Sequence, residues 1–224
     1  PSPDHPDRNQ PLEEGMPVSG NQEYILVKYL GEGHTSVIWL ARGTTTSQQV
    51  ALKFLRPDAS EITQANFWNE GLVLAELRDS GCTGTPLRLE TQKRNIGEWS
   101  FLALEYIDPN QYQPIDNLDE NQRVSEREAL EIADQALDLF DRLHRIVGRT
   151  YTDMQLKNFV WDRAARQLKV LDWNHVSIQE KYLTPDVLHS LGVNSFEELA
   201  QRDLTRFAAY LDKILVGKGA HERG

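Results

Sequence analysis

The chain has 224 residues, enough for one domain or for a domain built as two lobes. Its 34 acidic residues outnumber its 24 basic ones, and the resulting net charge of −10 argues against nucleic acid or an anionic membrane as a partner. The single cysteine, Cys82, excludes an intrachain disulfide and favours a reducing compartment, so we expect a cytoplasmic protein. No apolar run is long enough to predict a membrane span.

The N-terminal segment has a different composition from the rest of the chain. Residues 1–21 contain five prolines and almost no large apolar side chains, which predicts a disordered lead or linker. The chain does not begin with methionine. Together these features lead us to expect further domains in a parent protein.

The half that follows the lead is predicted to form a small sheet and one helix. A helix is expected over residues 58–77, which open on Asp-Ala-Ser-Glu. Segments rich in β-branched and aromatic residues predict strands, of which the first three form an antiparallel meander. These strands span residues 23–30, 36–41, 50–55, 87–90 and 99–106.

The second half is predicted to be mainly helical, after a polar loop over 109–121. Ser125 and Glu128 have the spacing of a capping box that opens a helix. Its apolar residues recur at helical spacing and predict one buried face, made of Leu130, Ala133, Leu137, Phe140 and His144. A hairpin is expected over 158–171, and a second capping box over 195–198 opens another helix. Strands followed by helices predict an α+β fold in two lobes.

Two features of the sheet region indicate phosphate chemistry. Gly31 and Gly33 lie between two predicted strands, where glycine lets backbone N–H groups approach a polyphosphate; a plain Gly-rich turn is the alternative. A dinucleotide fingerprint is not favoured, because it must open a helix. Lys53 lies mid-strand between large apolar residues and needs an anion if it faces inward, which Glu70 could supply. The alternative is a lysine at a surface edge.

The second half offers a complementary set of polar groups. The predicted hairpin brings Asp172 back beside Asn158, and a carboxylate with a carboxamide suits Mg²⁺. Asp153 could accept a proton from an attacking hydroxyl. The alternative is that all three are turn and cap residues.

Taken in chain order, these segments resemble the motifs of the protein-kinase-like superfamily. The Gly-rich hairpin, the Val-Ala-Leu-Lys strand ending at Lys53 and the Glu70 helix match the small lobe of that family. Asp153 to Asn158 has the spacing of the catalytic loop, and Asp172-Trp-Asn stands where the family has Asp-Phe-Gly. The resemblance covers residues 22–216. It implies an antiparallel small lobe with one helix over 22–107 and a mainly helical, truncated large lobe over 108–224.

The resemblance also implies an ATP- and Mg²⁺-dependent phosphotransferase acting on a protein Ser or Thr or on a small-molecule hydroxyl. By resemblance, Asp153 is the catalytic base, Asn158 and Asp172 bind Mg²⁺, and Lys157 neutralises the γ-phosphate. The remaining implied contacts to ATP come from the small lobe and one residue of the large lobe. They are Leu30, Gly31, Gly33, Ile38, Ala51, Lys53, Glu70, Glu105, Ile107 and Val160.

Several positions depart from the family pattern. Tyr151-Thr152 replaces the His-Arg that precedes the catalytic Asp, and Asn174 replaces a glycine, although Asn tolerates a positive φ. Asp203 resembles the helix residue that caps the catalytic loop. The segment after Asp172 is short, which weakens the case for a peptide substrate. The alternative function is therefore a catalytically inactive kinase-like module that binds a nucleotide or a regulatory protein partner.

Overall fold

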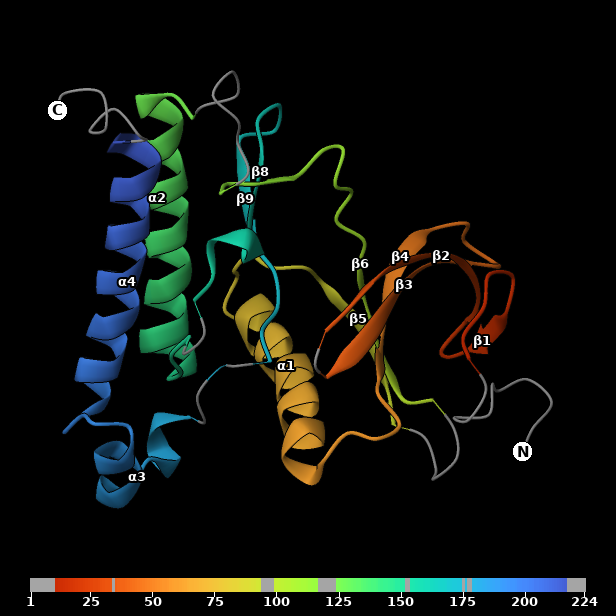
Figure 1. Ribbon diagram of the computed structural model, residues 1–224, viewed down its shortest axis with the longest axis horizontal. Coiled ribbons are helices and arrows are strands. Elements are labelled where there is room, and N and C mark those ends of the chain that lie inside the picture. Colours follow the sequence, from red (N-terminus) through yellow and green to blue (C-terminus); the bar gives the residue numbers. More distant parts are fainter. Residues whose placement is uncertain are drawn as a thin grey trace, which may run out of the picture. The chain divides into compact units, whose positions relative to one another are not determined.

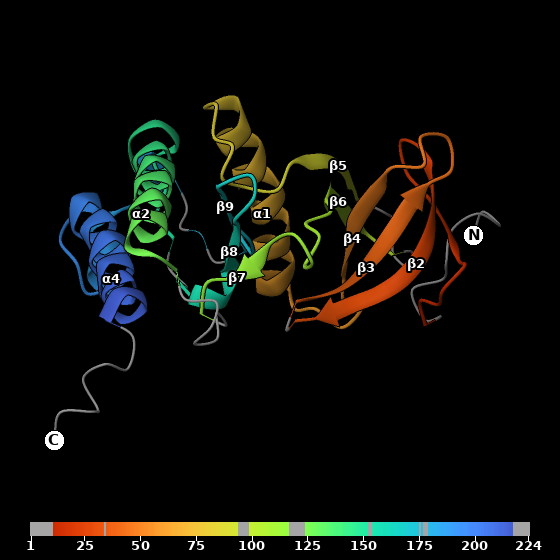
Figure 2. The same ribbon diagram turned by 90° about the horizontal axis from the view of Figure 1, so that it is seen from above.

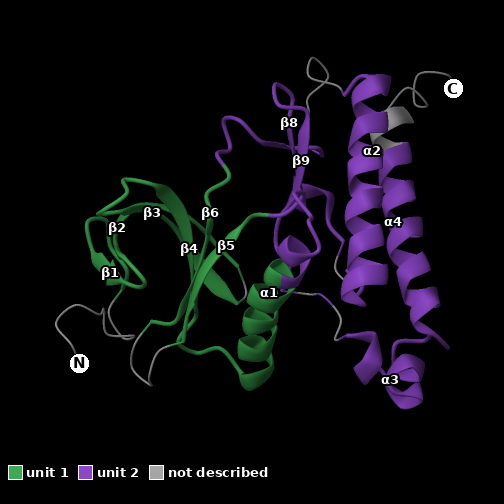
Figure 3. Ribbon diagram, turned by 180° about the vertical axis from the view of Figure 1, so that it is seen from behind, with its two compact units in different colours: residues 1–75, 86–107 green, residues 76–85, 108–224 purple. Residues whose placement is uncertain are grey.

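The computed structural model describes residues 11–33, 35–93, 99–116, 124–151, 154–174, 176 and 179–216, with side chains up to residue 212. The chain divides into two compact units (Figure 3). The first contains residues 1–75 and 86–107, and the second contains residues 76–85 and 108–224. The fold is α+β, with a curled antiparallel sheet followed by helices, as the sequence predicts.

The first unit is built on a six-stranded sheet in the order β1-β2-β3-β4-β6-β5 (Figure 1). The predicted meander is present, and each neighbouring pair is antiparallel. Alternate side chains of the strands fill one apolar core, where Leu52 and Phe54 are fully buried. The strands are β1 (Pro17–Ser19), β2 (Glu23–Glu32), β3 (Ser36–Gly43), β4 (Gln49–Leu55), β5 (Arg88–Gln92) and β6 (Phe101–Glu105).

Strand β1 lies within the stretch expected to be a disordered lead, so the structure differs from the sequence prediction there. Val18 is buried opposite Tyr24 of β2. The Glu90 carboxylate on β5 accepts hydrogen bonds from the backbone N–H of Asn21 at 2.9 Å and from the Tyr24 hydroxyl at 3.1 Å. Burial raises the pKa of Tyr24 to about 12, which keeps this hydroxyl a donor. A distant carboxylate therefore anchors the turn that composition alone marked as linker.

The second unit combines two long helices with a three-stranded sheet. Helices α2 (Glu126–Asp141) and α4 (Phe196–Val216) run side by side in opposite directions (Figure 1 and Figure 2). The Ser125 capping box is present, with both reciprocal hydrogen bonds formed. A π-helical turn, Arg142–Val147, continues α2. The other elements are β7 (Gln113–Pro114), β8 (Phe159–Asp162), β9 (Gln167–Val170) and α3 (Pro185–Ser190).

Helix α1 (Glu61–Asp79) begins three residues later than predicted and spans both units. Its Gly71 lies close to β6, since an added Cβ would come within 3.0 Å of the Leu102 side chain. Neither α1 nor α4, the longest helices among the described residues, carries an apolar stretch that could cross a bilayer.

The predicted buried face of α2 is wrong for two of its leucines. Leu130 is 63% exposed and Leu137 is 50% exposed, whereas Phe140 and His144 are buried as expected. The core of the unit instead receives the neighbouring face, made of Ala129, Ile132, Ala136 and Leu139. The helix has two apolar faces, and the one with small alanines allows the closer approach of β9 and α4.

The Asp162 carboxylate stabilises the turn between β8 and β9, and this contribution can be tested by substitution. The carboxylate accepts hydrogen bonds from the backbone N–H groups of Ala164 and Ala165 and from the Gln111 amide, which lower its pKa. Because the pKa of Asp162 is lower in the folded state, its carboxylate stabilises the fold at any pH above its unfolded-state pKa. This stabilisation is lost as the pH falls through the folded-state pKa. We expect Asp162→Asn to cost about 1 kcal/mol at neutral pH, with the difference closing below roughly pH 4.

Urea unfolding of both proteins between pH 3 and 7 checks this expectation. Asp58→Asn, at an exposed position, is the control and should match the unsubstituted chain throughout. A gap between Asp162→Asn and the unsubstituted chain that stays constant with pH would contradict the assigned role of the charge.

Candidate active site

The Gly-rich segment forms the turn between β2 and β3. Gly31 lies opposite Ile38 with φ at 152°, and the Gly33 amide donates to the Ser36 carbonyl at 2.8 Å. A Cβ added at either glycine would meet no atom of the described residues within 4 Å. Arg56 Nε donates a hydrogen bond to the Gly33 carbonyl at 3.0 Å. The backbone of the hairpin therefore borders open space, as a phosphate-binding turn requires.

Lys53 faces inward from β4 and pairs with Glu70 of α1. The Lys53 Nζ to Glu70 Oε2 distance is 2.6 Å, and the two side chains are only 6% and 2% exposed. Alternation along β4 explains the direction, because Leu52 and Phe54 fill the core on the opposite face. The sequence left an edge lysine as the alternative, and the structure excludes it. An ion pair buried this deeply costs much of its attraction in lost hydration, so it is weak evidence for a purely stabilising role.

The residues expected around the adenine are partly exposed. Ile38 pairs with Lys53 across β3 and β4, and both Ile38 and Ala51 are half-buried. Leu30 is 37% exposed near the end of β2. Glu105 ends β6, where its amide and its carboxylate both bond the backbone of Leu87, and Ile107 follows it half-buried.

In the second unit, the β8–β9 hairpin brings Asn158 and Asp172 together. The Leu171 amide donates to the Asn158 carbonyl at 2.7 Å. The Tyr151 hydroxyl donates to the Asp172 carbonyl at 2.9 Å and accepts from the Asn158 amide at 3.3 Å. Tyr151 also packs edge-on against Trp173, with the ring centroids 5.0 Å apart. One phenol thus joins the two segments that carry the predicted metal ligands.

Asp203 of α4 holds Tyr151 in place through a hydrogen bond to its backbone. Its Oδ2 atom accepts hydrogen bonds from the Tyr151 amide at 2.7 Å and from His144 Nε2 at 2.9 Å. Burial raises the pKa of Asp203, and the hydrogen bonds from His144 and Tyr151 oppose that rise. His144 stacks on Phe140, so it is the packed histidine that the sequence predicts.

Comparison with known proteins identifies the family. Residues 24–193 match the model of the protein kinase domain. The chain belongs to the protein kinase domain family. It is 24% identical over 206 residues to a protein of Corynebacterium efficiens described as "Serine/threonine-protein kinases drp72". That match covers 80% of this chain and 39% of the relative, so the chain spans about two-fifths of the length of that relative.

Against the kinase family pattern, the turn after β9 differs from expectation in its backbone. Asn174 stands at the position of the family's glycine and could tolerate a positive φ, but it is not among the residues with positive φ. Asp172 carries it instead, with φ at 59°. Asp tolerates the left-handed region better than most residues because its short side chain bonds locally. The candidate metal ligand itself therefore sits in the uncommon conformation.

The other predicted kinase residues fall in different surroundings. Val160 is buried on β8 opposite Lys169. Lys157 is exposed in a short 3-10 turn, two residues before β8 begins. Asp153 lies outside the described residues. The described part of the chain contains no cluster of three or more His, Cys, Asp or Glu side chains suited to a metal, so the magnesium prediction depends on Asn158 and Asp172.

Sequence reasoning missed the role of Tyr151 as a connection. It registered this residue only as a departure from the kinase pattern. The available signal was its place two residues before Asp153, where a hydrogen-bonding ring can reach the hairpin that returns the chain. Because its three hydroxyl contacts come from residues 7 to 21 positions away, only the folded chain could reveal them.

Proposed function

We propose that this kinase-family chain is an ATP- and Mg²⁺-dependent phosphotransferase whose acceptor is a protein Ser or Thr or a small-molecule hydroxyl. The observation that carries the proposal is the buried ion pair between Lys53 and Glu70. A fold gains little from such a pair, since apolar residues of similar volume serve as well or better. A cation held at a fixed place beside the open glycine turn is, however, what phosphate binding needs.

The residues present fit a magnesium nucleotide. Carboxylate and amide oxygens are the ligands that Mg²⁺ prefers, and the Tyr151 contacts hold the Asn158 and Asp172 segments together. In this proposal Lys53 binds the phosphates and the Gly31 and Gly33 backbone covers them. Bound Mg-ATP supplies the transferable phosphoryl group.

The proposed reaction assigns two further roles. Asp153 orients the acceptor hydroxyl and takes its proton, and Lys157, exposed and cationic, offsets charge on the γ-phosphate. The adenine contacts are proposed at Leu30, Ile38, Ala51, Val160 and the backbone from Glu105 to Ile107. The buried, unpaired Cys82 supports a further proposal, a reducing cytoplasmic location.

A kinase-like module without catalysis is the second candidate. The observation that favours it is Tyr151-Thr152, where the family has His-Arg before the catalytic Asp. Such a module would bind a nucleotide or a protein partner through its shape, and the Asp153 charge would be dispensable. The partner is then a regulatory protein in place of a phosphate acceptor.

Thermal unfolding with ATP separates these functions when it is combined with a transfer assay. We expect ATP to raise the melting temperature only with Mg²⁺, by an amount equivalent to about 2–3 kcal/mol at a hundredfold excess over Kd. Asp172→Asn should lose that shift, whereas Asp186→Asn, an exposed control, should keep it. Label from γ-phosphate-labelled ATP should reach an acceptor with the unsubstituted chain and not with Asp153→Asn.

Each result has a definite meaning. A magnesium-dependent shift without transfer to any tested protein or metabolite favours the non-catalytic module. Equal transfer by Asp153→Asn and the unsubstituted chain would overturn the catalytic assignment. No shift at saturating nucleotide in any variant would overturn nucleotide binding itself.

A further inference from the structure

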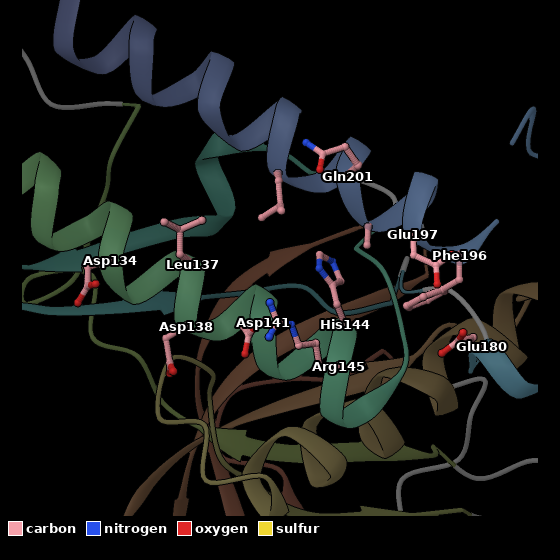
Figure 4. Close-up of a pocket in the computed structure, with 12 residues that line it drawn as sticks. Asp134, Leu137, Asp138, Asp141, His144, Arg145, Glu180, Phe196, Glu197 and Gln201 are labelled. Carbon is pink, nitrogen blue, oxygen red and sulfur yellow. Dashed lines mark ion pairs between the residues drawn. The ribbon is translucent and has the colours of Figure 1, made fainter. Parts of the chain in front are cut away.

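A groove between α2 and α4 is not used by the proposed phosphotransfer site. It lies within the second unit and encloses about 830 Å³. Figure 4 shows its two walls, with Leu137 and Asp138 on the α2 side and Phe196 and Gln201 on the α4 side. Of the hydrogen-bonded residues Tyr151, Asp203 and His144, only His144 lines the groove. The kinase roles proposed above therefore leave this surface without a function.

The apolar part of the groove continues along an exposed face of α2. Leu137 is 50% exposed at the groove, and Leu130, one heptad earlier, is 63% exposed. Residues seven apart lie on the same side of a helix, about 10 Å apart along its axis. Leu204 of α4 adds a half-buried leucine to the same lining. The heptad spacing of Leu130 and Leu137 is typical of a helix face that packs against a second helix.

The polar part of the groove is strongly acidic. One guanidinium, Arg145, is outnumbered by the carboxylates of Asp134, Asp138, Asp141, Glu180 and Glu197. Asp138 and Asp141 form pairs with Arg142 and Arg145 four residues along the helix, in which the two carboxylates stay 62% and 51% exposed, so the pairs contribute little. For Asp134 and Glu180, the described residues supply no ion pair at all. The groove therefore carries excess negative charge beside apolar surface.

We propose that this groove binds an amphipathic helix of a partner protein, with leucine-like residues on one face and Lys or Arg beside them. Apolar anchors would cover Leu130 and Leu137, and the basic residues would meet the acidic rim. A second copy of this chain is disfavoured, because two acidic grooves on chains of net charge −10 repel each other. The proposal does not depend on nucleotide binding or phosphotransfer.

Fluorescence anisotropy with a defined probe tests the proposal on the full chain. The probe is a labelled Leu/Lys helix of about 18 residues with leucines at i, i+3, i+4 and i+7. One comparison peptide has the same composition shuffled so that no leucine face forms, and another has Glu in place of Lys. We expect only the basic, one-faced helix to bind, and we expect raised salt to weaken it.

Matched variants locate the binding. Asp134→Lys/Glu197→Lys should weaken the probe about tenfold, and Leu137→Ser about fivefold. The control Asp58→Lys/Glu61→Lys makes the same change in net charge. Like the groove pair, Asp134→Lys/Glu197→Lys, it replaces one acidic residue in the first turn of a helix. Leu72→Ser removes a leucine that is 55% exposed on α1. Both controls should bind within about twofold of the unsubstituted chain.

Several outcomes would overturn the proposal. Equal weakening by the groove pair and the control pair would mean that binding merely follows net charge. Equal binding of the shuffled peptide would exclude recognition of a helical face. A dimer in size-exclusion chromatography that Leu137→Ser dissociates would assign the groove to a second copy. If circular dichroism shows that all variants are folded and the unsubstituted chain still does not bind the probe, the proposal is also rejected.

Discussion

Replacing Lys53 with methionine is expected to destabilise the chain by about 3–5 kcal/mol and to abolish magnesium-nucleotide binding. The substitution leaves the Glu70 carboxylate buried at 2% exposure without the cation that lies 2.6 Å away. Removing the cation paired with a buried charge costs more than the pair contributed. Chemical unfolding measures the first effect, and the ATP-dependent melting shift measures the second.

A double replacement separates stability from function. Lys53→Met/Glu70→Leu removes both charges, so we expect stability to return to within about 1–2 kcal/mol of the unsubstituted chain. Nucleotide binding should stay lost, because the phosphate-binding cation is still absent. Lys28→Met, at an exposed position on β2, is the control and should change neither property. Recovery of nucleotide binding in the double variant would refute the role proposed for Lys53.

Replacing Asp203 with alanine is expected to produce the second largest loss, about 3–5 kcal/mol. Its carboxylate is the shared acceptor for the Tyr151 amide and His144, and both donors are buried. Because both donors are buried, each bears a desolvation cost when this acceptor is removed. Because Tyr151 also holds the Asp172 and Asn158 segments, the magnesium-dependent ATP shift should weaken as well.

The control for Asp203 lies on the same helix. Asp212 is an exposed residue of α4, and Asp212→Ala should stay within about 0.5 kcal/mol of the unsubstituted chain. Urea unfolding gives the stabilities, and thermal shifts with ATP give the functional effect. If Asp203→Ala unfolds too readily to assay, Asp203→Asn keeps one acceptor and should give an intermediate loss. A stability loss in Asp203→Ala no larger than in Asp212→Ala would contradict the shared-acceptor role.

Features that depend on near neighbours in the chain could be predicted from the amino-acid sequence. Segments rich in β-branched and aromatic residues predicted the β2–β3–β4 meander, and the Ser125–Glu128 spacing predicted the start of α2. The order of the glycine turn, Lys53, Glu70, Asn158 and Asp172 along the chain was sufficient to suggest the kinase family. Local patterns carry such information because turns, caps and strand alternation are set by adjacent residues.

Which surfaces meet was settled by long-range packing in the folded chain. Helix α2 has two apolar faces, and the periodicity favoured Leu130 and Leu137, whereas packing buried Ile132 and Ala136. The positive φ fell on Asp172, where the long-range contact from Tyr151 holds the backbone. In each case the deciding partner lies far away in the chain. A helix is indifferent to which apolar face it buries until another element fits one of them, and a turn is fixed by the residues that contact it.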